Sequence, residues 1–96
     1  MWAFPKTLEI LNLSFNCLKK LDADMMRSLS NLTTLELSNN GIESLEGLEY
    51  VLRLKRLIAR NNQIQILDPV HTLQLLIEMD LENNPIDSAM QVLKAV

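Results

Sequence analysis

The sequence holds a single cysteine, Cys17, and a single histidine, His71, among its 96 residues. One cysteine cannot form a disulfide within the chain, and one residue of each type cannot supply the histidine and cysteine clusters that hold zinc. Neither residue is placed by its spacing to activate a nucleophile. These shortages argue against a disulfide-rich extracellular domain, a zinc site and an enzyme that works through a nucleophilic side chain.

Glycine and positive charge are also scarce. Gly41 and Gly47 stand singly, so no glycine-rich loop can cradle a phosphate. Nine lysines and arginines stand against twelve acidic residues, and the net charge of -3 offers no basic surface for nucleic acid. No apolar run approaches the roughly 20 residues that cross a bilayer. We therefore expect a soluble chain without a cofactor, a metal, a small-molecule substrate, a nucleic-acid partner or a membrane contact.

Apolar residues, in contrast, make up 48% of the chain and recur in a phrase that closes on an asparagine. The asparagines lie 24, 22 and 22 residues apart. The four phrases are Leu8-x-x-Leu11-x-Leu13-x-x-Asn16-x-Leu18, Leu32-x-x-Leu35-x-Leu37-x-x-Asn40-x-Ile42, Leu54-x-x-Leu57-x-Ala59-x-x-Asn62-x-Ile64 and Leu76-x-x-Met79-x-Leu81-x-x-Asn84-x-Ile86.

This phrase resembles the consensus of the leucine-rich repeat family, L-x-x-L-x-L-x-x-N/C-x-L. The resemblance covers nearly the whole chain and divides it into repeats near residues 8–31, 32–53, 54–75 and 76–96 of a single domain, 1–96. It implies an α/β solenoid of about four stacked repeats, with a parallel β-sheet on the concave face and short helical or 3₁₀ turns on the convex face. It also implies a surface that binds proteins, although such folds serve many tasks.

The residues themselves support this architecture. Alternation such as Leu35-Glu36-Leu37 predicts strands near 9–14, 33–38, 55–60 and 77–82. The strands must run parallel because every repeat travels in the same direction. After the asparagines of the second and third phrases, apolar residues recur every three positions, which fits 3₁₀ turns. This 22-residue form resembles the subtype found in a protein phosphatase regulatory subunit, an axonemal dynein light chain and a spliceosomal protein. The first repeat resembles the 24-residue type, and its convex side is expected to be irregular.

Each phrase asparagine has a predicted structural role. Where the chain turns inward after a strand, buried backbone groups need hydrogen-bond partners, and an amide offers both a donor and an acceptor. We expect a ladder that joins successive loops, made by Asn16, Asn40, Asn62 and Asn84.

The residues between the inward leucines are predicted to face solvent and to form a partner-binding concave surface. They are Ile10, Asn12, Thr34, Glu36, Arg56, Ile58, Arg60, Glu78, Asp80 and Glu82, with Phe15 beside them. In one interpretation the charges neutralise one another across strands, Arg56 facing Glu78 and Arg60 facing Glu82. In the other, the two arginines flank an exposed Ile58 as an interface anchor. Phe15 either packs in its turn beside the ladder or contacts the partner.

Three hypotheses for function follow. The first is a non-enzymatic protein-interaction module, either a scaffold or a regulatory subunit, in a reducing and therefore cytoplasmic or otherwise intracellular compartment. The second is a structural segment of a longer solenoid, since Trp2-x-x-Pro5-x-x-Leu8 continues the spacing of a preceding repeat. At the other end a short helix with Met90, Leu93 and Val96 would cap the stack. The third is an extracellular recognition domain, which the glycosylation patterns at Asn12 and Asn31 leave open.

Overall fold

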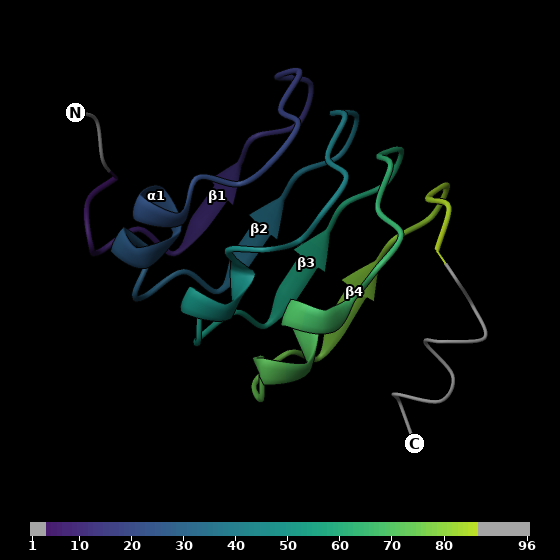
Figure 1. Cartoon of the computed structure of the whole chain (residues 1–96). Coiled ribbons are helices and arrows are strands. Elements are labelled where there is room, and N and C mark those ends of the chain that lie inside the picture. Colours follow the sequence, from purple (N-terminus) through teal and green to yellow (C-terminus); the bar gives the residue numbers. More distant parts are fainter. Residues whose placement is uncertain (1–3, 87–96) are drawn as a thin grey trace.

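The computed structural model describes residues 4–86, in which four repeats stack side by side (Figure 1). Their strands are β1 (Ile10–Asn12), β2 (Thr34–Glu36), β3 (Arg56–Ile58) and β4 (Glu78–Asp80). They form one parallel sheet in chain order, in the register that the phrases predict. The predicted parallel sheet is therefore confirmed.

The strands are shorter than the six-residue segments predicted for them. Backbone bonding does continue past each strand, because the Leu13 N–H donates to the Glu36 oxygen at 2.8 Å and the Phe15 N–H donates to the Ser38 oxygen at 3.0 Å. The chain then turns sharply, since Phe15 and its equivalents in the other repeats have a positive φ. This left-handed turn ends the extended backbone.

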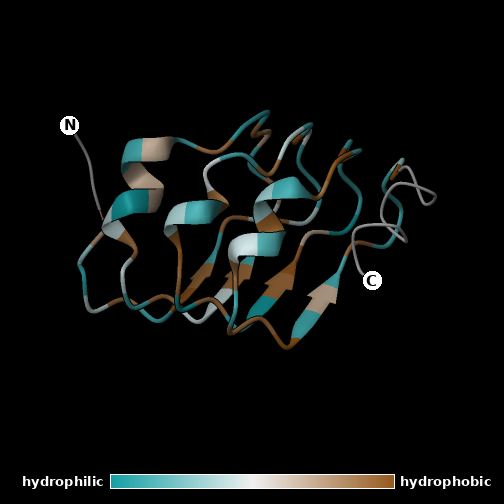
Figure 2. Ribbon diagram, turned by 60° about the horizontal axis from the view of Figure 1, so that its bottom comes forward, coloured by the Kyte–Doolittle hydropathy of each residue, from teal (hydrophilic) through white to brown (hydrophobic). Residues whose placement is uncertain are grey.

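The return segments lie on the side opposite the sheet (Figure 2). The first repeat forms α1 (Ala23–Ser28), which begins where the Asp22 carboxylate accepts the Asp24 N–H at 2.9 Å. The next two repeats form the 3₁₀ helices η1 (Leu48–Tyr50) and η2 (Asp68–Thr72). The predicted 3₁₀ turns of the second and third repeats are confirmed. The irregular convex side expected of the 24-residue repeat is wrong, because this repeat forms an α-helix with an Asp22 cap.

The hydrophobic core lies between the sheet and the return segments and is most complete in the second and third repeats. Leu35 and Leu57 are fully buried, whereas Leu11 of β1 is only partly buried. Met79 was predicted as an inward rung but is 40% exposed. Its strand, β4, is bonded to a neighbouring strand on one side only, which leaves its inward face less covered. The predicted capping helix lies outside the described residues.

The asparagine of the third phrase shows how the turns are satisfied. Asn62 is 2% exposed and is the one buried polar side chain found within residues 4–86. Its Nδ2 donates to the carbonyl oxygens of Ala59 at 3.2 Å and Arg60 at 3.1 Å in its own turn, and of Leu37 at 3.0 Å in the preceding repeat. One amide therefore ties two neighbouring repeats together.

The amide oxygens of the ladder also bond the repeat that precedes each asparagine. Oδ1 of Asn62 accepts the N–H groups of Asn40 and Ile42, both at 3.2 Å. Oδ1 of Asn40 accepts two N–H groups of the first repeat, and Oδ1 of Asn84 accepts the Ile64 N–H at 3.1 Å. Each of these three asparagines therefore bonds its own turn and the turn of the repeat before it.

Replacing Asn62 by Ala should lower the free energy of unfolding by about 1–3 kcal/mol, because buried backbone donors and acceptors would lose their partner. Urea denaturation of both proteins measures the difference. The matched control is Gln63→Ala, which removes a neighbouring amide from an exposed side chain and should change stability little. Equal losses in the two variants would contradict the role of the ladder.

Candidate interaction surface on the sheet

The side chains that alternate with the buried leucines form three rows across the sheet, which we call the concave face. Glu36, for example, lies between the fully buried Leu35 and Leu37 and so points away from the core. With the strands in register, the rows are Ile10, Thr34, Arg56 and Glu78; then Asn12, Glu36, Ile58 and Asp80; then Ser14, Ser38, Arg60 and Glu82.

The two arginines of the concave face both pair with acidic residues of the last repeat. Arg56 Nε lies 2.9 Å from Glu78 Oε1, and Arg56 Nη2 lies 3.4 Å from Glu78 Oε2, so this pair has two contacts. Arg60 was predicted to pair with Glu82, but its short contact is diagonal, from Nε to Asp80 Oδ2 at 2.6 Å. Its Nη1 is 3.7 Å from Glu82 Oε2. The Asp80 side chain is less exposed than that of Glu82.

The contact between Arg60 and Asp80 shifts the pKa of both groups. The hydrogen bond from Arg60, followed by one from the Glu82 N–H, lowers the pKa of Asp80. The same hydrogen bond to Asp80 raises the pKa of Arg60. A carboxyl whose pKa is lower in the folded protein stabilises the fold above its unfolded pKa and loses that contribution as pH falls through the folded pKa. The pair is solvated, so its contribution is small.

Glu36 is the acidic residue of the concave face that no arginine pairs with in the described part of the chain. Within residues 4–86 it forms no ion pair, and it lies between Asn12 of β1 and Ile58 of β3. Ile58 was predicted to be exposed, but it is partly buried. It sits on an inner strand with neighbours on both sides, and such neighbours cover part of a side chain. Ile58 is therefore less exposed than the anchor interpretation assumes, and the anchor itself stays a prediction.

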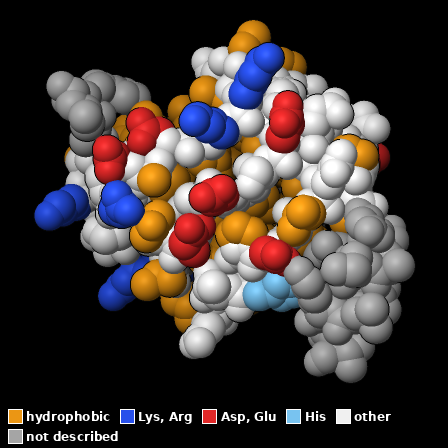
Figure 3. Space-filling model, viewed as in Figure 1, with side chains coloured by type: hydrophobic (Ala, Val, Ile, Leu, Met, Phe, Trp, Pro, Cys, Tyr) orange, Lys and Arg blue, Asp and Glu red, His pale blue; other side chains and the backbone are white. Residues whose placement is uncertain are grey.

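Exposed apolar residues lie instead at both ends of the sheet, where Ile77, just before β4, is 81% exposed. Ile10 is 65% exposed, and Phe15, in the turn after β1, is 77% exposed. Of the two alternatives for Phe15, packing beside the asparagine ladder is wrong, because the residue is mostly exposed. Figure 3 shows, on the face it presents, basic and acidic side chains interspersed with hydrophobic ones and no broad area of one sign.

A second set of hydrogen-bonded asparagines was not predicted from the sequence. Asn39, Asn61 and Asn83 each precede a ladder asparagine, and Nδ2 of Asn61 donates to Asn39 Oδ1 at 3.2 Å. Nδ2 of Asn83 donates to Asn61 Oδ1 at 2.7 Å. We call these three residues the outer ladder. Its signal in the sequence is the pair Asn-Asn in three of the four phrases.

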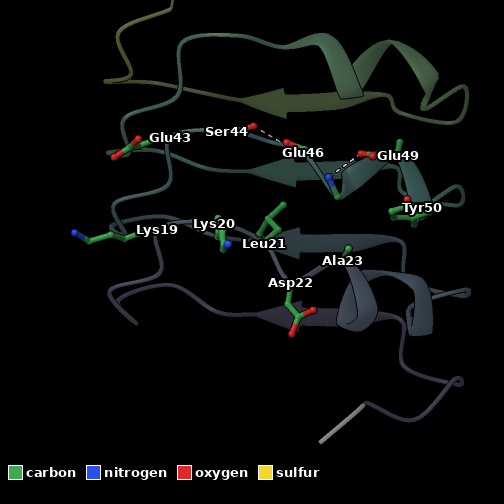
Figure 4. A pocket seen from close by; sticks show the side chains of 11 residues that line it. Lys19, Lys20, Leu21, Asp22, Ala23, Glu43, Ser44, Glu46, Glu49 and Tyr50 are labelled. Carbon is green, nitrogen blue, oxygen red and sulfur yellow. Dashed lines mark hydrogen bonds between the residues drawn. The ribbon is translucent and has the colours of Figure 1, made fainter. Parts of the chain in front are cut away.

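On the return side, residues of the first and second repeats line a groove (Figure 4). Lys19 and Lys20 line it from the first repeat, and Glu43, Glu46 and Glu49 line it from the second. Within the described part of the chain no ion pair joins the two sets. Across residues 4–86 no three His, Cys, Asp or Glu side chains are grouped to hold a metal ion. No helix there is long and apolar enough to span a membrane.

Removing the guanidinium in Arg60→Gln should raise the pKa of the Asp80 carboxyl towards the ordinary aspartate value, since the largest cause of its depression is lost. An NMR titration of the carboxyl carbon measures this shift. Arg56→Gln is the matched control and should leave Asp80 unchanged, because Arg56 pairs with Glu78. An Asp80 pKa that is the same in wild type and Arg60→Gln would contradict the diagonal contact.

Comparison with known proteins places this architecture in context. A family model described as leucine-rich repeats in two copies matches residues 6–50. Geranylgeranyl transferase type-2 subunit alpha from Homo sapiens is 34% identical over 87 residues, covering 88% of this chain and 15% of that protein. Leucine-rich repeat-containing protein 36 from Homo sapiens is 37% identical over 87 residues, covering 85% of this chain and 12% of that protein.

The chain thus spans only a small part of the length of these relatives. Leucine-rich repeat-containing protein 56 from Rattus norvegicus is similar in this respect, with 35% identity over 82 residues, 85% of this chain and 15% of that protein. The crystal structure of internalin C2 from Listeria monocytogenes matches with a TM-score of 0.77 and 30% identity, over 85% of this chain and 35% of that one. The chain therefore has the leucine-rich repeat fold, and its residues 6–50 carry two copies of the repeat that defines this family.

Proposed function

We propose that the chain is a non-enzymatic module that binds a partner protein through its concave face. The observation that carries this proposal is that neither the hydrophobic core nor the asparagine ladder uses the side chains of the concave face. Its side chains point away from the buried leucines, and they include two arginines, four carboxylates and the exposed Ile10. A varied set of groups on a hydrogen-bonded sheet suits recognition of another protein.

The charge of the concave face indicates the kind of partner. Arg56 and Arg60 together offset two of the carboxylates, which leaves a net negative charge on Glu36 and the acidic residues of the last repeat. Such a face attracts a basic partner segment and repels nucleic-acid phosphate. We include in this proposed binding site Asn12 and Thr34 on the first two strands and Phe15 in the turn after β1.

A scaffold or regulatory subunit is the role we favour for such a module. The repeats of 22 residues resemble those of a protein phosphatase regulatory subunit, and the transferase relative is itself named as a subunit. A reducing, cytoplasmic setting is consistent with Cys17 as the single cysteine. Catalysis, a cofactor and a membrane contact play no part in this proposal.

Two alternatives rest on particular observations. The chain spans 12–15% of its named relatives, so it can equally serve as a structural segment of a longer solenoid. An extracellular recognition domain is the other alternative, and Asn12 bears on it directly. Asn12 lies on the concave face, where its Oδ1 accepts the Ser14 N–H at 2.9 Å. A glycan there would cover the proposed surface, so glycosylation at Asn12 and concave-face binding exclude each other.

The double variant Ile58→Asp with Arg60→Glu should abolish capture of the partner while the fold persists. The change puts a carboxylate in place of the apolar Ile58 side chain, where a docked partner would have to desolvate it, and it removes the Arg60 guanidinium that contacts Asp80. These local losses outweigh the added attraction for a basic segment. The measurement is affinity capture from cell extract, quantified by mass spectrometry against wild type. A thermal melt of each protein checks folding, because Ile58 is partly buried.

The matched control makes the same two kinds of substitution away from the sheet. It is Ile66→Asp with Arg53→Glu, since both residues are exposed and neither belongs to a strand. This control should capture the same proteins as wild type. Equal capture by the concave-face variant would assign binding to another surface. A chain that captures nothing specific in any form would favour the structural alternative.

A further inference from the structure

The residue before each ladder asparagine adopts the same left-handed backbone in all four repeats. Its φ is 63° at Phe15, 58° at Asn39, 58° at Asn61 and 62° at Asn83. Asparagine is among the residues that tolerate this conformation best, whereas a bulky aromatic residue there is an outlier. The first repeat therefore departs from the residue type that its own turn favours.

This departure also removes a hydrogen bond from the fold. The outer ladder runs from Asn83 through Asn61 to Asn39, and a fourth asparagine would extend it into the first repeat. A phenyl ring can neither donate nor accept such a bond. The same turn has a second left-handed residue, Cys17, with φ of 57°, at a position where the other repeats have no positive φ. Phe15 is thus unfavourable for the fold in two ways, through its strained backbone and through the missing hydrogen bond of the outer ladder.

Burial does not compensate for them. The side chain of Phe15 is 77% exposed, so little of its apolar surface is removed from water. An exposed residue held in a strained backbone conformation is a candidate for contact with another molecule.

The neighbourhood of Phe15 indicates the chemistry of that molecule. Its N–H donates to the Ser38 oxygen at 3.0 Å, which ties the turn to the strand that carries Glu36 two residues earlier. Ser14 Oγ accepts the Ser38 N–H at 3.0 Å and joins the same two strands. Glu36 is the concave-face carboxylate without an ion pair in residues 4–86, and no outward residue of β1 carries a charge. An apolar ring and an unpaired carboxylate thus lie on adjoining segments.

We propose that Phe15 and Glu36 together receive a peptide segment of the partner that bears an apolar side chain and, a few residues away, a lysine or arginine. The apolar side chain packs on the Phe15 ring, and the cation pairs with Glu36. This inference rests on the proposed concave-face function and specifies that the partner is held at Glu36 on that face and at Phe15 in the turn beside it. It places the contact at the first two repeats rather than around Ile58.

The first experiment measures what Phe15 does for the fold. Phe15→Asn restores the residue type of the other repeats and should raise the melting temperature, because it relieves the backbone and extends the outer ladder. Phe15→Ala removes the ring but keeps the left-handed strain, and its melting temperature should stay close to that of wild type. A lower melting temperature for Phe15→Asn would show that the ring stabilises the fold, and the proposal would be overturned.

The second experiment uses a display library of random 12-residue peptides selected on the wild-type chain. We expect enrichment of peptides with a lysine or arginine near an aliphatic or aromatic residue. The affinity of a synthesised peptide from this selection, measured by fluorescence anisotropy, should fall about tenfold or more in Phe15→Asn and in Phe15→Ala, as for loss of an interface anchor. In Glu36→Gln the preference for lysine or arginine should disappear from a repeated selection.

The results separate this inference from the broader proposal. Selected peptides that bind Phe15→Asn as tightly as wild type but lose affinity for Ile58→Asp with Arg60→Glu would overturn the role of Phe15 and leave concave-face binding intact. Selected peptides that lose affinity for Phe15→Asn and keep their basic preference in Glu36→Gln would overturn the pairing with Glu36. Enrichment of acidic peptides, or of none, would overturn the proposed peptide chemistry.

Discussion

The structure depends on a side-chain amide that bonds backbone groups of two successive repeats. Asn62 donates to carbonyl oxygens of its own turn and of the preceding repeat, and it accepts two N–H groups of that repeat. Apolar packing alone would allow neighbouring repeats to slide, because leucine contacts are not directional. Hydrogen bonds at a fixed spacing set the register between repeats. That register in turn sets which outward side chains become neighbours.

The concave face is a consequence of this register. Buried leucines alternate with outward residues, so every rung that the ladder aligns also aligns one member of each outward row. The rows are chemically uneven: the last two repeats hold the paired arginines and carboxylates, and the first two hold Ile10 and the unpaired Glu36, with Phe15 in the turn after β1. Since the fold uses none of these groups for its core, their chemistry can differ from repeat to repeat without disturbing the stack.

The sequence predicted the sheet better than the surface. Alternating leucines in a repeated phrase permit essentially one arrangement, so strand direction and the register of Leu35 with Leu57 followed from the pattern. Strand length did not, because it depends on the left-handed turns. The pairing of Arg60 with Asp80 and the cover over Ile58 depend on side-chain rotamers and lateral neighbours, which a linear pattern does not encode. The sequence left two alternatives for Phe15 open for a related reason: its turn position, shared with Asn39, becomes apparent only in the backbone angles.

Amide hydrogen exchange followed by NMR tests the central claim most directly. The N–H groups of Ile42 and Ile64 donate to asparagine oxygens of the next repeat, whereas the Leu37 N–H donates to the Ile58 oxygen across the sheet at 2.7 Å. If the amide ladder is as much a part of the fold as the sheet, all three should exchange only through the same cooperative opening. Exchange of Ile42 and Ile64 at the rates of an unprotected peptide, while Leu37 stays protected, would contradict the account.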